Sequence, residues 1–124
     1  MMKMMTEDSW KEGETMTENS WKEFLSQMKV VKKIDTIRRK GTLLEEIFWW
    51  LKKKGTFVER NGWYPSGNCC GYHEQFLMGR IDRINIRIVW TEARVGMPTL
   101  SVAVGSEKEW TMLRQSLRDA GFVR

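Results

Sequence analysis

Alternating hydrophobic and polar positions are clearest in the second half of the chain, where they predict the strands of an antiparallel sheet. Ile84, Ile86 and Ile88 occupy every second position of residues 83–90, the spacing that places side chains on one face of a strand. Residues 100–104 show the same alternation after a turn that contains Gly and Pro. We therefore expect these two segments to be neighbouring antiparallel strands with one buried face.

Two further strands are predicted upstream, at 56–60 and 74–78. Asn61-Gly62 follows the first of them and is a strong turn dipeptide, because both residues tolerate a positive φ angle. The segment 63–73 is then expected to be a long irregular loop, rich in Gly and aromatic residues. Loops on a rigid frame often carry binding residues, so this segment is a candidate site.

Three segments have the apolar spacing of helices, and each begins with a Ser or Thr three positions before a Glu, the pattern of a capping box. The three patterns are Ser20-x-x-Glu23, Thr42-x-x-Glu45 and Ser106-x-x-Glu109. The first helix is expected to end near Asp35, the second at Gly55 and the third at Gly121. Both glycines are predicted to be left-handed stops, and Phe122 should fold back on Leu117 as in a Schellman motif.

These elements predict an α+β domain with a small antiparallel sheet of three or four strands. Two N-terminal helices and a C-terminal helix are expected to pack on one face of the sheet. We assign this single domain to residues 20–124 and treat residues 1–19 as an acidic N-terminal arm, partly helical or flexible. The arm contains most of a near-duplication, since residues 5–12 closely match residues 16–23.

The composition is that of a soluble globular domain, with 124 residues of which 41% are hydrophobic and 30% charged. No uninterrupted apolar stretch approaches the roughly 20 residues needed to span a bilayer. The N-terminal residues also lack the apolar segment of a signal peptide. We therefore expect a cytoplasmic protein with no membrane partner.

Charge is unevenly distributed along the chain. Residues 1–28 contain three Lys and six acidic residues, a net charge of −3, so the overall charge of +5 leaves +8 on residues 29–124. A basic body of this kind favours an anionic partner such as nucleic acid, because phosphates attract cations and release their own counterions on binding.

The candidate nucleic-acid contacts comprise two groups of cations and one group of aromatic residues. The cations are Lys29, Lys32, Lys33, Arg38, Arg39 and Lys40, which form the densest basic stretch, and Arg83 and Arg87 on the polar face of the strand 83–90. The aromatic residues are Trp63, Tyr64 and Tyr72, which would stack on bases. Basic residues near a helix C-terminus also complement the helix dipole, which is a purely structural explanation for the first group.

Cys69, Cys70 and His73 are the only thiols and the only imidazole of the chain. Adjacent cysteines are awkward ligands for one tetrahedral centre, and a closed zinc site needs four ligands. We therefore predict neither a metal site nor a cofactor, and we expect both cysteines to be reduced thiols.

If the chain is an enzyme, its chemistry should centre on His73, because an imidazole transfers protons readily near neutral pH. Together with Arg80, Arg83 and Arg87 it would form a set that can cleave RNA. The imidazole would move a proton from a 2′-hydroxyl while the arginines stabilise charge on the phosphate.

Three segments also carry a family resemblance. Residues 51–60 look like a helix end and a following strand, residues 71–76 contain a Gly-x-His element before a strand, and residues 113–121 look like a closing helix. In this order they resemble the HicA-type toxins, small RNases of toxin and antitoxin pairs, over residues 43–122 at most. The resemblance implies an α-β-β-β-α layout like that of a double-stranded-RNA-binding domain, with His73 as the catalytic residue.

The favoured hypothesis is a small, non-enzymatic basic module that docks on nucleic acid or on a nucleoprotein complex, because charge and aromatic residues are evident and a catalytic constellation is not. One alternative is a protein-binding inhibitor of a larger complex, of the type that phages and mobile elements encode, in which the acidic arm and Trp10 engage a basic surface. The other is a HicA-like RNase that uses His73. An uncovered sheet face or Trp49 would also support a homodimer.

Overall fold

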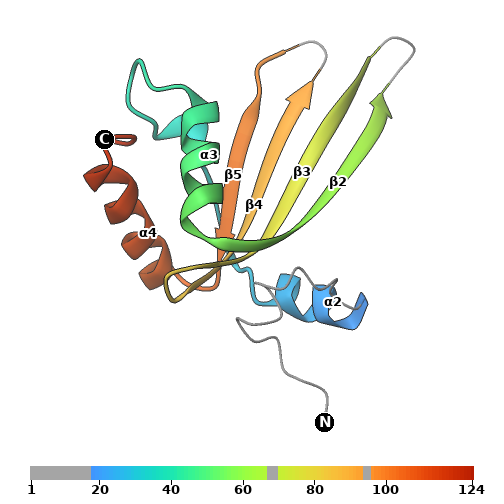
Figure 1. Cartoon of the computed structure of the whole chain (residues 1–124), viewed down its shortest axis with the longest axis horizontal. Helices are drawn as coiled ribbons and strands as arrows, with labels where there is room; N and C mark the ends of the chain where they lie inside the picture. Colours follow the sequence, from blue (N-terminus) through green and yellow to red (C-terminus); the bar gives the residue numbers. More distant parts are fainter. Residues whose placement is uncertain (1–17, 67–69, 94–95) are drawn as a thin grey trace.

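The computed structural model describes residues 18–66, 70–93 and 96–124 of the chain (Figure 1). The side chains of Trp63 and Tyr64, the residue Cys69, and residues 1–17 of the predicted arm lie outside the described part. None of the described helices is long or apolar enough to cross a lipid bilayer.

A five-stranded antiparallel sheet forms the centre of the fold, which confirms the α+β class and corrects the expected number of strands. The strands follow the order β1-β5-β4-β3-β2 across the sheet. Their bounds are Val30–Lys33 for β1, Thr56–Ser66 for β2, Cys70–Ile81 for β3, Ile84–Ala93 for β4 and Thr99–Val104 for β5.

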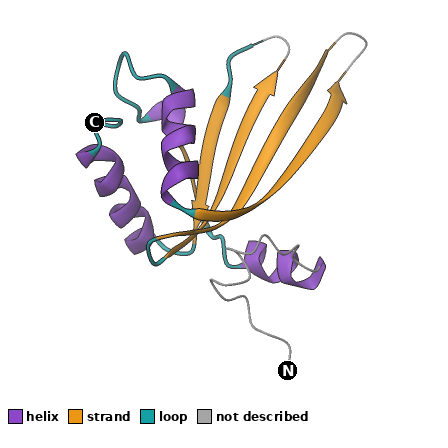
Figure 2. Ribbon diagram, in the orientation of Figure 1, coloured by secondary structure: helices purple, strands orange, loops and turns teal. Residues whose placement is uncertain are grey.

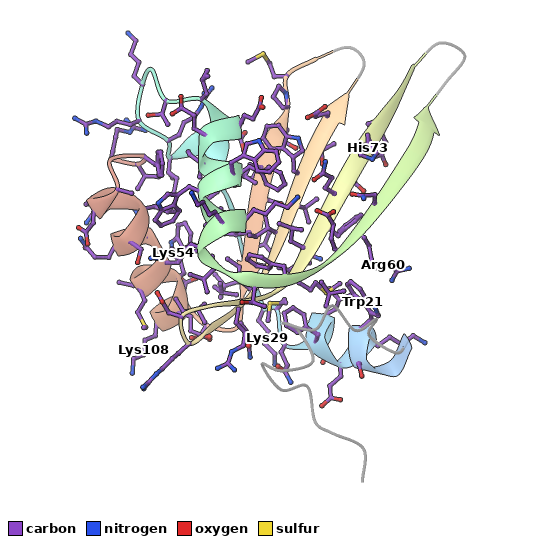
Figure 3. All side chains as sticks on the ribbon, viewed as in Figure 1. Trp21, Lys29, Lys54, Arg60, His73 and Lys108 are labelled. Atoms are coloured by element: carbon purple, nitrogen blue, oxygen red, sulfur yellow. The ribbon has the colours of Figure 1, made fainter. Side chains whose placement is uncertain are left out.

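The three described helices lie on both faces of the sheet rather than on one. They are α2 (Glu18–Ser26), α3 (Leu44–Lys54) and α4 (Glu107–Asp119). Helices α3 and α4 pack together against one face, whereas α2 contacts the other face near β2 and β3 (Figures 1 and 2). Figure 3 shows Trp21 between α2 and the sheet.

The first predicted helix is much shorter than expected. It ends at Ser26 instead of near Asp35, and the chain continues as β1 and then as the short 3-10 helix η1 (Ile34–Thr36). The reason is the edge of the sheet: Val30 pairs with Val104 and packs on the core, which favours an extended chain for two consecutive β-branched valines.

The predicted turn at Asn61-Gly62 is also wrong, because β2 runs straight through it. Asn61 and Gly62 pair with Gln75 and Glu74 of β3, and the ladder extends to Ser66 and Cys70. Residues 63–66 and 70–73 are therefore strand, not loop. Continuing the ladder gives the backbone groups of both segments their hydrogen-bond partners, which outweighs the local turn preference.

The core lies between the sheet and the helices α3 and α4. Its sheet side consists of alternate residues of β3, β4 and β5, and the prediction of Ile84, Ile86 and Ile88 as buried positions is confirmed. The Phe48 ring of α3 stacks on Trp90 of β4 with centroids 5.2 Å apart.

Four strands lie between α3 and α4 along the chain, so the three-strand layout that the family resemblance implied is not observed.

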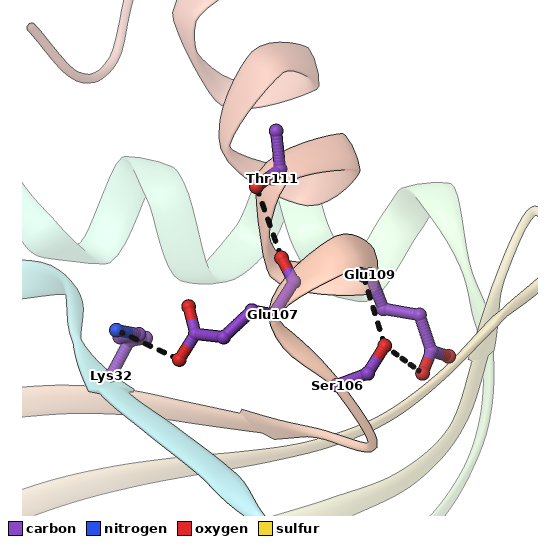
Figure 4. Close-up of polar contacts among 5 residues, drawn as sticks. All are labelled: Lys32, Ser106, Glu107, Glu109 and Thr111. Atoms are coloured by element: carbon purple, nitrogen blue, oxygen red, sulfur yellow. Dashed lines mark hydrogen bonds and ion pairs between the residues drawn. The ribbon is translucent and has the colours of Figure 1, made fainter.

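The three predicted capping boxes have different outcomes. At α4 the N-cap is confirmed, because Ser106 Oγ accepts a hydrogen bond from the Glu109 backbone N–H at 3.3 Å (Figure 4). The Glu109 carboxylate accepts from the Ser106 hydroxyl at 3.1 Å, whereas a full capping box directs it to the Ser106 backbone N–H. Ser20 instead lies inside α2, and the residue before α3 is Leu43, whose side chain makes no capping hydrogen bond. Two of the three boxes are therefore wrong.

The two predicted glycine stops also differ. Gly121 has a φ angle of +87°, and the Phe122 N–H donates to the Leu117 carbonyl at 3.0 Å, so the Schellman stop of α4 is confirmed. Gly55 is extended, with φ −107°, and is needed for space: a Cβ there would lie 2.6 Å from the Arg80 carbonyl oxygen.

The capping difference gives a test of helix stability. Ser106→Ala is expected to lower the free energy of unfolding by about 1 kcal/mol, because it removes the side-chain acceptor of the α4 N-terminus. Thr42→Ala is the matched control and should change it by only a few tenths of that amount, since Thr42 does not cap α3. Urea unfolding followed by circular dichroism measures both, and equal losses would contradict the assignment.

Candidate nucleic-acid interface

One face of the sheet is only partly covered. Along β4 the residues Ile84, Ile86, Ile88 and Trp90 are buried under the helices, whereas the alternate residues are half-buried on the opposite side. We call that opposite side the open face. By strand alternation and register its described residues are Val31, Lys33, Thr56, Val58, Arg60, Gly62, Tyr72, Glu74, Phe76, Met78, Arg80, Asn85, Arg87, Val89, Thr91, Thr99, Ser101 and Ala103.

Helix α2 covers one corner of the open face through a small apolar cluster. Trp21 and Phe24 of α2 pack on Met78 of β3, with Met28 and Val58 at the margin, and this cluster is separate from the main core. Outside it the exposure is uneven: Val31 on β1 is 56% exposed, whereas Phe76 and Arg87 are half-buried and Ala103 is fully buried.

The strand register places cations on both sides of an aromatic residue on the open face. Arg60, Phe76, Val89, Ser101 and Lys33 are successive cross-strand partners on β2, β3, β4, β5 and β1. Strands lie about 4.8 Å apart, so this row spans about 19 Å. Arg87 stands in the adjacent row, between Met78 and Ala103.

Aromatic residues follow the same face along β3. Tyr72 and Phe76 are four residues apart and both half-buried, which separates their Cα atoms by about 13 Å. Tyr64 is the register partner of Tyr72. Glu74, between the two aromatic residues, accepts a hydrogen bond from the Thr91 hydroxyl at 3.2 Å. Glu74 is the one carboxylate among the described strand residues of the open face.

A pocket of about 260 Å³ lies between α2 and the sheet. Its lining comprises Trp21, Leu25, Arg60, Asn61, Phe76, Met78 and Arg87. The Arg60 guanidinium lies over the Trp21 ring, 4.7 Å from its centroid, and Figure 3 shows the two residues beside each other. Sequence reasoning missed Arg60 and Trp21 as site residues, because it placed Arg60 beside a turn and Trp21 in the core.

The basic stretch predicted over residues 29–40 is divided by β1. Lys32 turns toward the helices, where it pairs with Glu107 at 3.5 Å and lies 5.9 Å from the centre of the Trp110 ring (Figure 4). Lys33 points to the open face instead, because alternate residues of a strand face opposite sides. The predicted helical stretch therefore does not form one continuous surface.

A second group of cations gathers where β1, β2 and β4 begin and β3 and β5 end. The antiparallel order brings these five strand ends to one edge, and five exposed basic residues lie in the adjoining segments. They are Lys29, Lys53, Lys54, Arg83 and Lys108, the basal cluster, of which Lys29, Lys54 and Lys108 are labelled in Figure 3. Arg83 occupies the β3–β4 turn rather than a strand, which corrects its predicted place.

A third group, the corner cluster, forms where the loop before α3 meets the C-terminal residues. The Arg39 N–H donates to the Phe122 carbonyl at 2.7 Å, and Arg38 forms an isolated bridge with Val123. Arg38, Arg39 and Lys40 are thus brought close to the chain segment that carries Arg118 and Arg124. Sequence reasoning missed both of these arginines, since only the tertiary contact joins them to the loop.

Few of these charges are neutralised by ion pairs. Within the described residues, ion pairs join Lys32 to Glu107 and Lys52 to Glu59. Among the residues that the structure describes, the cations thus form three groups rather than one.

His73 stands apart from the arginines with which an RNase site was predicted. It pairs with Glu92 of β4 and Trp63 of β2, near the start of β3, and its alternation places it on the face opposite Arg87. Arg83 lies at the other end of the sheet, ten residues along the chain. No group of three or more His, Cys, Asp and Glu side chains in the described ranges is arranged to hold a metal ion.

Comparison with known proteins identifies no family model that matches the chain, no matching curated protein and no matching solved structure. Function is therefore argued from the open face and the cation groups themselves.

The separate cluster under α2 gives a test of how that helix is held. Trp21→Ala is expected to reduce amide protection in α2 while β3 and β4 keep theirs, because the main core does not include Trp21. Trp110→Ala removes a ring of the main core and should cost about 3–5 kcal/mol of unfolding free energy. Hydrogen exchange with mass spectrometry measures both, and a loss of protection throughout the sheet in Trp21→Ala would refute the distinction.

Proposed function

We propose that the open face binds single-stranded nucleic acid without chemical turnover. The observation that carries this proposal is the gathering of Phe76 and Tyr72 with Arg60, Arg87 and Lys33 on one partly exposed sheet face. Aromatic side chains stack on bases of any sequence, and the surrounding cations contact phosphates.

The shape of the face favours a single strand over a duplex. The described helix on this face, α2, packs flat on the sheet through Trp21 and Phe24, so it does not project to enter a major groove, which is how most duplex-reading proteins reach base edges. Unpaired bases can instead lie flat on the side chains of Phe76 and Tyr72. Sheet faces with two exposed aromatic residues use this arrangement to bind RNA.

The basal cluster extends the cationic surface beyond the strands. Lys29 follows α2, which lies on the open face, and Arg83 follows the strand that carries Phe76. A bound strand that leaves the face at this edge meets their charges, which adds affinity without adding sequence preference. The corner cluster adjoins α3 and α4 and contributes less, because the helices separate it from the open face.

A protein partner is the second candidate, supported by a separate pocket of about 400 Å³ at the start of α3. Leu43 and Met97 line it and are 60% and 75% exposed. Exposed apolar side chains around a pocket are typical of protein-binding surfaces.

Salt dependence tests the phosphate contacts. With Lys33, Arg60 and Arg87 as the phosphate contacts, the logarithm of the binding constant for an oligouridylate ten-mer should fall against the logarithm of salt concentration with a slope of about −2. Lys33→Gln should make the slope about 0.7 less negative, whereas Lys40→Gln, in the corner cluster, should leave it nearly unchanged. Fluorescence anisotropy between 25 and 200 mM salt, roughly the range where such effects are large, measures the slopes. No binding at the lowest salt would remove the proposal and favour the protein partner.

His73→Ala separates binding from cleavage. Because His73 faces away from Arg87, the variant should bind the same ten-mer within about twofold of the unmodified protein, a difference below 0.5 kcal/mol. Gel electrophoresis after incubation should show intact RNA with both proteins. Cleavage by the unmodified protein that His73→Ala abolishes would establish the RNase alternative in place of this proposal.

A further inference from the structure

The pocket between α2 and the sheet has the properties of a binding site for one base of the strand. Its volume of about 260 Å³ is below the roughly 300–1,000 Å³ of sites that enclose a whole small molecule. One nucleobase fits such a space while its sugar and phosphate remain on the open face. The inference developed from this pocket rests on the proposed function.

One residue of the pocket has a buried donor without a partner. Arg87 lines the pocket, and its Nε is shielded from solvent without a hydrogen bond within the described structure. A buried N–H without an acceptor costs about 1–3 kcal/mol, and native proteins rarely leave one unpaired. A shift of the guanidinium toward a ligand acceptor in the pocket would remove this cost.

The second guanidinium of the pocket is held in place by an aromatic ring. The Arg60 guanidinium lies over the Trp21 ring, 4.7 Å from its centroid, a cation–π contact that favours this position of the side chain. Phe76 supplies an apolar ring surface in the same lining. Stacking and hydrogen bonding are therefore both provided within one pocket.

The charged groups of the lining are donors only. Arg60 and Arg87 line the pocket, and neither Asp nor Glu does so among the described residues. Guanine presents two adjacent acceptors, O6 and N7, which match a guanidinium in the most common specific contact between proteins and bases. Adenine replaces one of these acceptors with an amino donor, which would face a cation.

From these observations we infer that the pocket selects a guanine of a single-stranded nucleic acid, with Arg87 as the residue that determines the preference. Arg60 and Trp21 hold the pocket open beside α2, and Phe76 carries the base. The remaining nucleotides bind the open face with little regard to sequence.

The test compares three oligouridylate ten-mers that carry guanine, adenine or 7-deazaguanine at the fifth position. Fluorescence anisotropy should show the guanine ten-mer binding about tenfold more tightly than the adenine one. The 7-deazaguanine ten-mer should lose most of that advantage, because it lacks the N7 acceptor. Equal affinities for guanine and adenine would overturn the inference while leaving the proposed function intact.

Two variants separate base selection from charge. Arg87→Lys keeps the positive charge but lacks the planar fork, so it should bring the guanine and adenine ten-mers to within about twofold of each other. Lys33→Gln, on the open face outside the pocket, should weaken all three ten-mers by a similar factor. If Arg87→Lys unfolds, as judged by circular dichroism, Arg87→Met replaces it.

Preserved tenfold selection in a folded Arg87 variant would refute the role of Arg87. Failure of the unmodified protein to bind any ten-mer would overturn both the inference and the proposed function on which it rests.

Discussion

The fold depends on the burial of one face of β4 and β5 beneath α3 and α4. Isoleucine, valine and leucine side chains from these strands meet Phe48, Trp110 and their neighbours in one continuous core. Apolar burial of this kind supplies most of the free energy of folding, at about 25 cal/mol per Å². Because alternate residues of a strand face opposite sides, the same burial determines which polar side chains of β3 and β4 are displayed on the open face. Core and candidate site are therefore two consequences of one alternation.

The elements with an unambiguous period were predictable from the sequence, and those with competing signals were not. The isoleucine alternation of β4 and the amphipathic α4 with its Ser106 cap could be read directly. Residues 30–33 are compatible with both helical and extended spacing, and only the partner strand β5 decides between them. Asn61-Gly62 carries a strong local turn preference that the β2–β3 ladder overrides. In both cases strand pairing between segments distant in the sequence outweighs the local conformational preference.

The candidate site was predictable only in part, for a similar reason. Arg87 belongs to the open face as its predicted strand position suggested, whereas Tyr72 was predicted in a loop and reaches this face only because β3 begins at Cys70. Lys33 joins them, while its neighbour Lys32 pairs with Glu107 on the other side. The number of cations in a basic run of the sequence is thus larger than the number on any one surface, because a strand divides the run between the two faces of the sheet. Arg60 and Trp21 belong to the candidate site because α2 and β2, which are distant in the sequence, are in contact. Local sequence patterns do not predict this contact.

The position of β2 at the border of the sheet has a consequence for the behaviour of the protein at high concentration. This eleven-residue strand has β3 as its one ladder partner in the described structure, and the outer row of a border strand can template another chain. Pro65 interrupts that row of donors near one end, and the charged Glu59 and Arg60 side chains disfavour the dry stacking of identical strands. The length of β2 favours edge-to-edge aggregation, and Glu59, Arg60 and Pro65 oppose it.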